Sequence, residues 1–252
     1  MFTERYCNFE ANLLKLMDTI PMIRKTLLLA AVLAAPCFLF AQKAPNSIDE
    51  NGLKQGEWAK YNAEGQLIYT GAFSDDKPTG LFTYFFEDGT KKAELPYEDG
   101  EVLKASSKTF HRNGKVMSEG TYVNKNRDGE WKFYDEDEKL ISEEYYDNGL
   151  KTGIWKVYYY NGTLNEETTY ENDRKNGPWK QYFTDGTLKV TGTYVNDLLE
   201  GESVYYHPDG KVMVRGSYVK NLKHGKWVFF DQDGTMVKEQ EYTMGKLPDD
   251  PQ

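Results

Sequence analysis

The chain has 252 residues, of which 15% are aromatic and 28% are charged, and its formal net charge is -9. An acidic surface repels phosphate backbones and anionic headgroups, so this charge argues against nucleic-acid binding and, more weakly, against membrane binding. Rings supply much of the apolar surface, which favours half-buried β-sheets.

Residues 22–41 have the order of a secretory signal peptide. Arg24 and Lys25 come first, an apolar run over residues 27–40 follows, and Ala41 ends the segment. The run is shorter than the roughly 20 residues that a membrane-spanning helix needs, which favours cleavage over anchoring. We expect cleavage near Ala41 and export to the periplasm, the cell envelope or the medium. A leader that does not function would leave the protein in the cytoplasm.

Residues 1–21 carry three carboxylates ahead of this basic region, which a signal peptide should not. We interpret them as an upstream mis-start or leader extension, with Met22 as the true start. The alternative is a lipoprotein signal ending at Cys37, although Pro36 does not fit that pattern. Because Cys7 and Cys37 both lie in the leader, the mature chain would have neither a disulfide nor a thiolate site.

A linker is expected over residues 42–50, and residues 51–244 then repeat with a 24-residue period and one 25-residue step. A polar tail follows over residues 245–252. A fixed period of this length indicates a repeat architecture. We count each unit from its first residue, called position 0. From the first unit to the eighth, this residue is Gly56, Gly80, Ala105, Gly129, Gly153, Gly177, Gly201 and Gly225.

Each unit has the pattern of a β-hairpin. Aromatic residues stand at positions 5 and 17, and Asp-Gly or Asn-Gly pairs such as Asp88-Gly89 end at position 9 in six units. Such pairs predict a type I′ hairpin turn. The second turn of each unit is too short for a crossover helix, so successive hairpins must pair antiparallel. The predicted fold is all-β, an elongated and twisted antiparallel meander of about eight stacked hairpins, preceded by a helical signal peptide.

Aromatic side chains are expected on both faces of this sheet, because positions 2 and 5 have opposite parity. Position 2 is Phe82 in the second unit and serine in the third and seventh, at Ser107 and Ser203. Elsewhere it is tryptophan: Trp58, Trp131, Trp155, Trp179 and Trp227.

The segment from Gly216 to Trp227, GSYVKNLKHGKW, resembles the MORN repeat, and the overall spacing is similar to the bacterial MORN variant. The resemblance covers residues 51–244. It implies interaction or membrane-tethering modules rather than enzymes, some of them labelled antitoxins. The third unit departs from the pattern because Ala105 and Ser107 replace its glycine and its tryptophan. If the third unit bends or interrupts the ribbon, a uniform family model fails there.

The residues that could carry chemistry fall on repeat positions. His111 and His207 both stand at position 6, and His224 precedes a position 0 glycine, so all three are predicted to serve turns or the surface. The acidic run 135–138 is interpreted as a solvated turn rather than a calcium site. No phosphate-binding loop, nucleophile elbow or HExxH motif occurs. The sequence predicts no enzyme, no metal and no cofactor.

Trp58, Trp131, Trp155, Trp179 and Trp227 are the candidate binding face. A row of indoles can stack on sugars or enclose a quaternary ammonium group, whereas the structural interpretation is that each packs on the neighbouring hairpin. The predicted function is an exported, non-catalytic scaffold that binds an unidentified protein. Two alternatives stay open: an antitoxin or immunity protein with a cognate toxin, suggested only by the resemblance, and glycan or envelope binding through the aromatic face.

Overall fold

The computed structural model describes residues 45–98 and 103–248, and within them all regular structure is β-strand. The expected signal peptide and the segment before it lie outside these residues. No helix in the described ranges is long and apolar enough to cross a membrane. The predicted all-β meander is therefore confirmed for the repeats.

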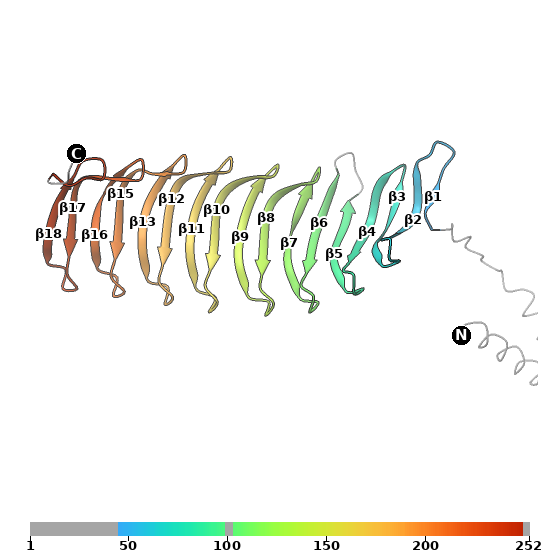
Figure 1. The fold of residues 1–252 in the computed structure, drawn as a ribbon, viewed down its shortest axis with the longest axis horizontal. Helices are drawn as coiled ribbons and strands as arrows, with labels where there is room; N and C mark the ends of the chain where they lie inside the picture. Colours follow the sequence, from blue (N-terminus) through green and yellow to red (C-terminus); the bar gives the residue numbers. More distant parts are fainter. Residues whose placement is uncertain (1–44, 99–102, 249–252) are drawn as a thin grey trace, which may run out of the picture. The chain divides into compact units, whose positions relative to one another are not determined.

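One antiparallel sheet contains all the strands, which follow one another in chain order (Figure 1). Strands β14 and β15 both pair with β13. The strands are β1 Ser47–Ile48, β2 Lys54–Tyr61, β3 Leu67–Ser74, β4 Lys77–Phe85, β5 Lys91–Glu98, β6 Lys104–Phe110, β7 Val116–Val123, β8 Asn126–Tyr134, β9 Leu140–Asp147, β10 Leu150–Tyr158, β11 Leu164–Glu171, β12 Arg174–Tyr182, β13 Leu188–Val195, β14 Leu198–Leu199, β15 Gly201–Tyr206, β16 Val212–Val219, β17 Leu222–Phe230 and β18 Met236–Tyr242.

The turns at the Asp-Gly and Asn-Gly pairs are not type I′, so that prediction is wrong. In the second unit Gly89 has a φ of 82°, but Asp88 has no positive φ. The Gly89 N–H donates to the Phe86 carbonyl at 2.9 Å, which describes a type I turn followed by one left-handed residue. The Asp88 carboxylate accepts the Thr90 N–H at 2.9 Å. The aspartate therefore serves through its side chain and not through its backbone conformation.

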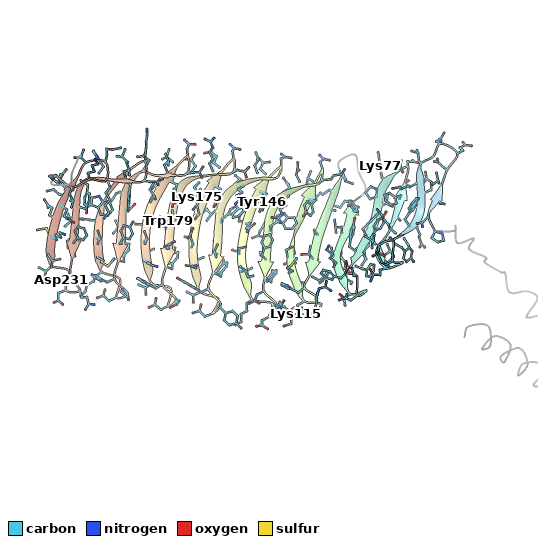
Figure 2. The ribbon with its side chains drawn as sticks, viewed as in Figure 1. Lys77, Lys115, Tyr146, Lys175, Trp179 and Asp231 are labelled. Carbon is cyan, nitrogen blue, oxygen red and sulfur yellow. The ribbon has the colours of Figure 1, made fainter. Side chains whose placement is uncertain are left out.

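Type I′ turns occupy the opposite edge of the sheet, at positions 19 and 20, where both residues have positive φ. Figure 2 shows the two edges, with Lys77 and Lys175 close to the type I′ turns and Lys115 and Asp231 at the other edge. Asparagine and aspartate are common at these positions because they tolerate the left-handed conformation. The described pairs are Asp75-Asp76, Asn124-Lys125, Asn148-Gly149, Asn172-Asp173, Asn196-Asp197, Lys220-Asn221 and Met244-Gly245.

The position 0 glycine marks a β-bulge. Thr70 pairs with Thr83 and Ala72 with Thr79, so three residues of β4 lie opposite Gly71 of β3. Gly80 begins these three and has a φ of 62°, a conformation that favours glycine. The glycine is therefore required by the bulge that starts each complete unit.

The third unit has lost the bulge and continues the sheet. Ala105 has no positive φ and pairs with Tyr97, while Lys108 pairs with Glu94, so both strands advance by the same number of residues. The third unit therefore does not interrupt the ribbon: β5 and β6 form a regular ladder. The extra residue of the 25-residue step lies between these two strands.

The core lies on one face of this single-layer sheet. Every side chain that is buried among the described residues stands at position 0, 2, 13, 15 or 17, and we call this side the Trp face. Its buried members are Phe82, Ala93, Ala105, Ser107, Ser118, Trp131, Ser142, Tyr146, Thr168, Val190, Ser203 and Trp227. The opposite side, which carries positions 1, 3, 5, 14 and 16, we call the Tyr face.

Both ends of the repeat array are more ordered than expected. Within the expected linker, β1 pairs with β2, and the Asn46 side-chain amide donates to the Ala59 carbonyl at 3.0 Å. At the other end, Gly245 completes the last type I′ turn, and its N–H donates to the Lys223 carbonyl at 2.7 Å. The linker and the tail each contribute a few residues to the sheet.

Candidate functional site

The Trp155 site shows how an indole packs on this face. The ring of Trp155 lies 5.2 Å from the ring of Tyr146 and 5.0 Å from that of Tyr170. Tyr146 is the position 17 residue of the preceding unit, and Tyr170 is that of the same unit. Such tilted and edge-to-face pairs contribute about 0.5–1.5 kcal/mol each beyond burial. The indole N–H of Trp155 donates to the Tyr145 carbonyl at 3.0 Å. Equivalent bonds join Trp131 to Thr121 at 3.2 Å and Trp227 to Ser217 at 3.1 Å.

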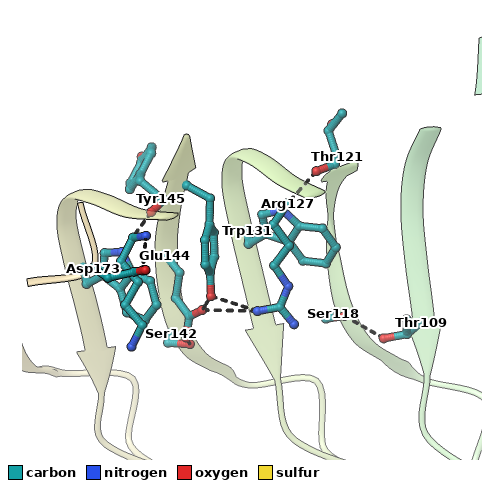
Figure 3. Close-up of polar contacts among 12 residues, drawn as sticks. Thr109, Ser118, Thr121, Arg127, Trp131, Ser142, Glu144, Tyr145 and Asp173 are labelled. Carbon is teal, nitrogen blue, oxygen red and sulfur yellow. Dashed lines mark hydrogen bonds and ion pairs between the residues drawn. The ribbon is translucent and has the colours of Figure 1, made fainter. Parts of the chain in front are cut away.

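A cationic side chain four residues earlier covers the indole. The Arg127 guanidinium lies 4.7 Å from the Trp131 ring and donates to the Tyr146 hydroxyl at 2.8 Å (Figure 3). Lys151 and Lys223 lie 4.4 Å from their tryptophans. Cation–π attraction of this kind stabilises a partly exposed ring. Where serine replaces tryptophan, leucine replaces the cation: Leu103 precedes Ser107 and Leu199 precedes Ser203 by the same four residues.

The structure divides the candidate binding face into two groups. Trp131 and Trp227 are each 1% exposed, so a ligand could stack on them only after displacing their neighbours. Trp58, Trp155 and Trp179 are half-buried. For these three, ligand binding stays a prediction.

Close backbone approach explains a further set of glycines, which sequence reasoning missed. A Cβ atom on Gly120, at position 15, would lie 2.3 Å from the Trp131 ring of the next unit. Gly216 has the same relation to Trp227 at 2.3 Å, and Gly71 to Phe82 at 2.5 Å. A side chain at these positions would overlap an aromatic ring, so the glycine and the ring form a matched pair.

The Tyr face carries a ladder of tyrosine, glutamate and lysine. The Tyr134 hydroxyl donates to Glu119 of the preceding unit at 2.8 Å. Burial, and then this hydrogen bond, raise the pKa of Tyr134 to about 12. Tyr158 and Tyr182 make the same bond to Glu143 at 2.8 Å and to Glu167 at 2.9 Å. Lys132 and Lys156 approach Glu143 at 3.9 and 3.7 Å, and Lys180 approaches Glu167 at 3.8 Å.

All three histidines join repeat units, as predicted for turn residues. Nε2 of His111 is 2.9 Å from the Tyr134 carbonyl, and Nε2 of His207 is 3.3 Å from that of Phe230. The His224 Nδ1 accepts the Met244 N–H at 3.5 Å. Among the described residues no group of three or more His, Cys, Asp or Glu side chains is placed to hold a metal ion.

The third unit contains a pocket of about 420 Å³ on the Trp face. Its walls include Tyr97 and Tyr122, the two position 17 rings that would flank a tryptophan at Ser107. Burial raises the pKa of Tyr97. The remaining walls are mainly apolar and include two lysines: Ile68, Tyr84, Phe85, Lys92, Ala93, Leu95, Leu103, Ala105, Ser107, Thr109 and Lys125. The pocket thus borders the position 2 site that an indole fills elsewhere, where Ser107 is 2% exposed.

The seventh unit also has serine at position 2, but its space is filled. Ser203 is 1% exposed. A Cβ atom added to Gly192 would lie 2.9 Å from the Ser203 Oγ and 3.5 Å from Leu199, so these side chains pack closely against the glycine. Tyr205 at position 4 packs 6.3 Å from Trp227 and shares a hydrogen bond of 2.9 Å with Tyr218. The third unit has only Thr109 at this position. Thr109 is smaller than Tyr205, so the third and seventh units differ in side-chain volume at position 4.

Seven stretches of the chain match the family described as MORN repeat variant: residues 78–99, 105–124, 127–148, 151–172, 175–196, 199–220 and 223–243. Together they span more than half of the sequence. The chain belongs to the MORN repeat variant family. The longest gap between matched stretches, residues 100–104, lies next to the strand where the position 0 bulge is absent, and the other gaps are two residues each.

No curated protein matches this MORN chain. Among solved structures, it is similar to a point mutant of S. aureus TarM in complex with Fondaparinux, alpha-GlcNAc-glycerol and UDP, at 14% identity and a TM-score of 0.30 over 43% of this chain. A crystal structure of TarM gives 15% identity and a TM-score of 0.29 over 42% of this chain. The MORN chain spans about a fifth of the length of these proteins, 21% in both cases.

Proposed function

We propose that this protein is an exported, non-catalytic MORN scaffold that binds a protein partner through its Tyr face. The supporting observation is the one-sided core: tryptophans, glycines and small residues occupy the Trp face, and the Tyr face of the sheet stays accessible. MORN repeats are commonly protein-binding or membrane-binding repeats. Many polar side chains of the described repeats form links between neighbouring units.

The Tyr face offers an uncharged row beside its charged ladder. From position 16 of the fourth unit to position 16 of the sixth, positions 1 and 16 carry Tyr145, Ile154, Thr169, Pro178 and Thr193, and Glu130 at position 1 of the fourth unit borders this row. Ile154 is 49% exposed and Tyr145 is 37% exposed. Exposed apolar groups rimmed by charged residues are typical of protein interaction sites, with the charges directing the approach of the partner. This row is where we place the contact.

The function is tested by affinity capture from the organism's own envelope fraction, followed by measurement of binding to the captured protein. Ile154→Asp places a charge in the row and is expected to weaken that binding at least tenfold. Val237→Asp is the matched control, because Val237 is 61% exposed but lies in the eighth unit. Equal binding by the two variants, or the absence of any reproducible partner, would contradict the proposal.

Export is tested by N-terminal sequencing of the mature protein, which we expect to begin after Ala41. If the mature protein begins at Met1 or Met22, it is cytoplasmic, and the antitoxin alternative is then favoured. The glycan alternative depends on the three half-buried indoles. Titration with peptidoglycan fragments and choline, followed by Trp fluorescence, tests it directly.

A further inference from the structure

We propose that the pocket of the third unit binds an aromatic side chain of a protein partner, in the place that tryptophan fills elsewhere in the sheet. The inference rests on the proposed function, because it names a group that the partner contributes. It adds a second contact, on the opposite face from the uncharged row.

The other units provide the template for this ligand. Trp155 lies between Tyr146 and Tyr170, at 5.2 and 5.0 Å. The corresponding rings in the third unit are Tyr97 and Tyr122, and both line the pocket. The carbonyl that corresponds to the acceptor of the Trp155 indole N–H is that of Pro96, because Pro96 and Tyr145 both stand at position 16. The site thus repeats the surroundings of an indole without containing one.

The size and polarity of the pocket suit a ring. Its volume of about 420 Å³ lies within the usual range of ligand pockets, roughly 300–1,000 Å³. An apolar cavity of about 150 Å³ is already enough to bind benzene in a protein interior. Leu103 stands four residues before Ser107, where complete units carry lysine or arginine. The side chain at this position that would cover a bound ring is therefore apolar.

A neighbouring cavity favours a ring that is part of a polypeptide. This second cavity has a volume of about 610 Å³ and shares Tyr97, Leu103 and Lys125 with the pocket. A free aromatic molecule would leave it empty, whereas residues next to an inserted side chain would occupy it. Its charged lining consists of three carboxylates and two lysines, which favours a basic residue beside the aromatic one: Asp75, Asp76, Glu98, Lys77 and Lys125.

Calorimetric titration of the purified protein with indole tests the pocket itself. We expect saturable binding, with shifts of the Tyr97 and Tyr122 ring signals in NMR spectra. Two variants should weaken it at least tenfold by filling the space. Ser107→Trp copies the complete units, and Thr109→Tyr copies Tyr205 of the seventh unit. The second variant keeps the test decisive if Leu95 prevents Ser107→Trp from folding.

Lys108→Trp is the matched control, because it adds an indole to the same strand but on the Tyr face. It should bind indole like the unchanged protein. The pocket proposal is overturned if indole does not bind, or if Thr109→Tyr, folded by circular dichroism, binds it as well as Lys108→Trp does.

A peptide with the sequence of residues 151–156, KTGIWK, tests the protein partner. It carries a tryptophan four residues after a lysine, as the complete units do. We expect it to bind at least tenfold more tightly than indole and to lose binding when Trp155→Ala is made in the peptide. Binding of indole without binding of the peptide would overturn the proposal of a polypeptide ligand.

The two proposals fail in different ways. If Thr109→Tyr abolishes indole binding but leaves capture of the partner unchanged, the pocket proposal is wrong and the scaffold function stands. If no partner is captured, the scaffold function is wrong, whatever the titration shows.

Discussion

Glu138 occupies the position 9 site that glycine holds in the other units, and it takes the left-handed conformation with a φ of 66°. Its N–H still donates to the Asp135 carbonyl at 3.0 Å, so the turn forms despite the side chain. A left-handed conformation costs an L-residue about 1–2 kcal/mol. The fourth unit therefore carries local strain that its neighbours avoid.

Glu138→Gly should stabilise the protein by about 1 kcal/mol, because glycine adopts this conformation without a steric penalty while giving back some unfolded-state entropy. The change in unfolding free energy is measured by chemical denaturation. Glu136→Gly is the control, since Glu136 lies in the same turn without a positive φ and should gain nothing. Equal stability of the two variants would show that the left-handed residue costs nothing here.

At the level of single residues, sequence reasoning identified most of what the repeat uses. The periodicity gives the repeat positions of Trp58 and of the position 17 aromatics. The packing of each tryptophan on a neighbouring hairpin was one of the two interpretations of the sequence. The pocket was not predicted. Ala105 and Ser107 marked the place, but a pocket depends on how the surrounding side chains pack, which the repeat pattern does not give. The substitution of leucine for the cation, at Leu103 and Leu199, was a signal in the sequence that could have been found.

The turns are the elements that hold successive hairpins together. The Asp197 carboxylate accepts the Lys175 N–H at 2.8 Å, and the Asp197 N–H donates to the Lys175 carbonyl at 2.9 Å. The same side-chain bond runs from Lys151 to Asp173 at 2.7 Å and from Lys54 to Asp76 at 2.9 Å. A type I′ turn needs a positive φ at both central residues, and an Asp-Gly pair does not determine whether the aspartate adopts one. The turn positions themselves were correct.

Asp197→Ala should lower the free energy of unfolding by about 1–3 kcal/mol, because it removes the acceptor and places alanine at a φ of 70°. Asp197→Asn should have little effect. Asn221 already makes this contact in the next turn, where its side-chain oxygen accepts the Leu199 N–H at 2.7 Å. Urea denaturation of both variants measures the difference. A loss in the asparagine variant as large as in the alanine variant would mean that charge, rather than the hydrogen bond, holds the turn.

Across the whole molecule, the tyrosines couple stability to alkaline pH. Burial comes first and a glutamate hydrogen bond second in raising the pKa of Tyr134, Tyr146 and Tyr182 to about 12. An unfolded tyrosine ionises near pH 10. These tyrosines therefore stay protonated to a higher pH in the folded state than in the unfolded state. Their contribution to the free energy of unfolding is complete below about pH 10 and is lost as the pH rises toward 12.

We expect the melting temperature to fall steeply between about pH 10 and 12, followed by circular dichroism, with tyrosinate absorbance rising at the same step. Tyr182→Phe should flatten this dependence while costing some stability at neutral pH through the lost bond to Glu167. An unchanged slope in the variant would remove Tyr182 from the explanation.

The turn-to-turn bonds have a consequence for how such a chain can change its length. Residues one period of 24 apart occupy equivalent places in the sheet throughout the fourth to seventh units. Removal of one period from this stretch rejoins equivalent residues wherever the cut begins, inside a strand as well as within a loop. A chain of this kind can therefore gain or lose one 24-residue block and keep the strand pairing of the sheet. Selection can then act on the number of units separately from the fold.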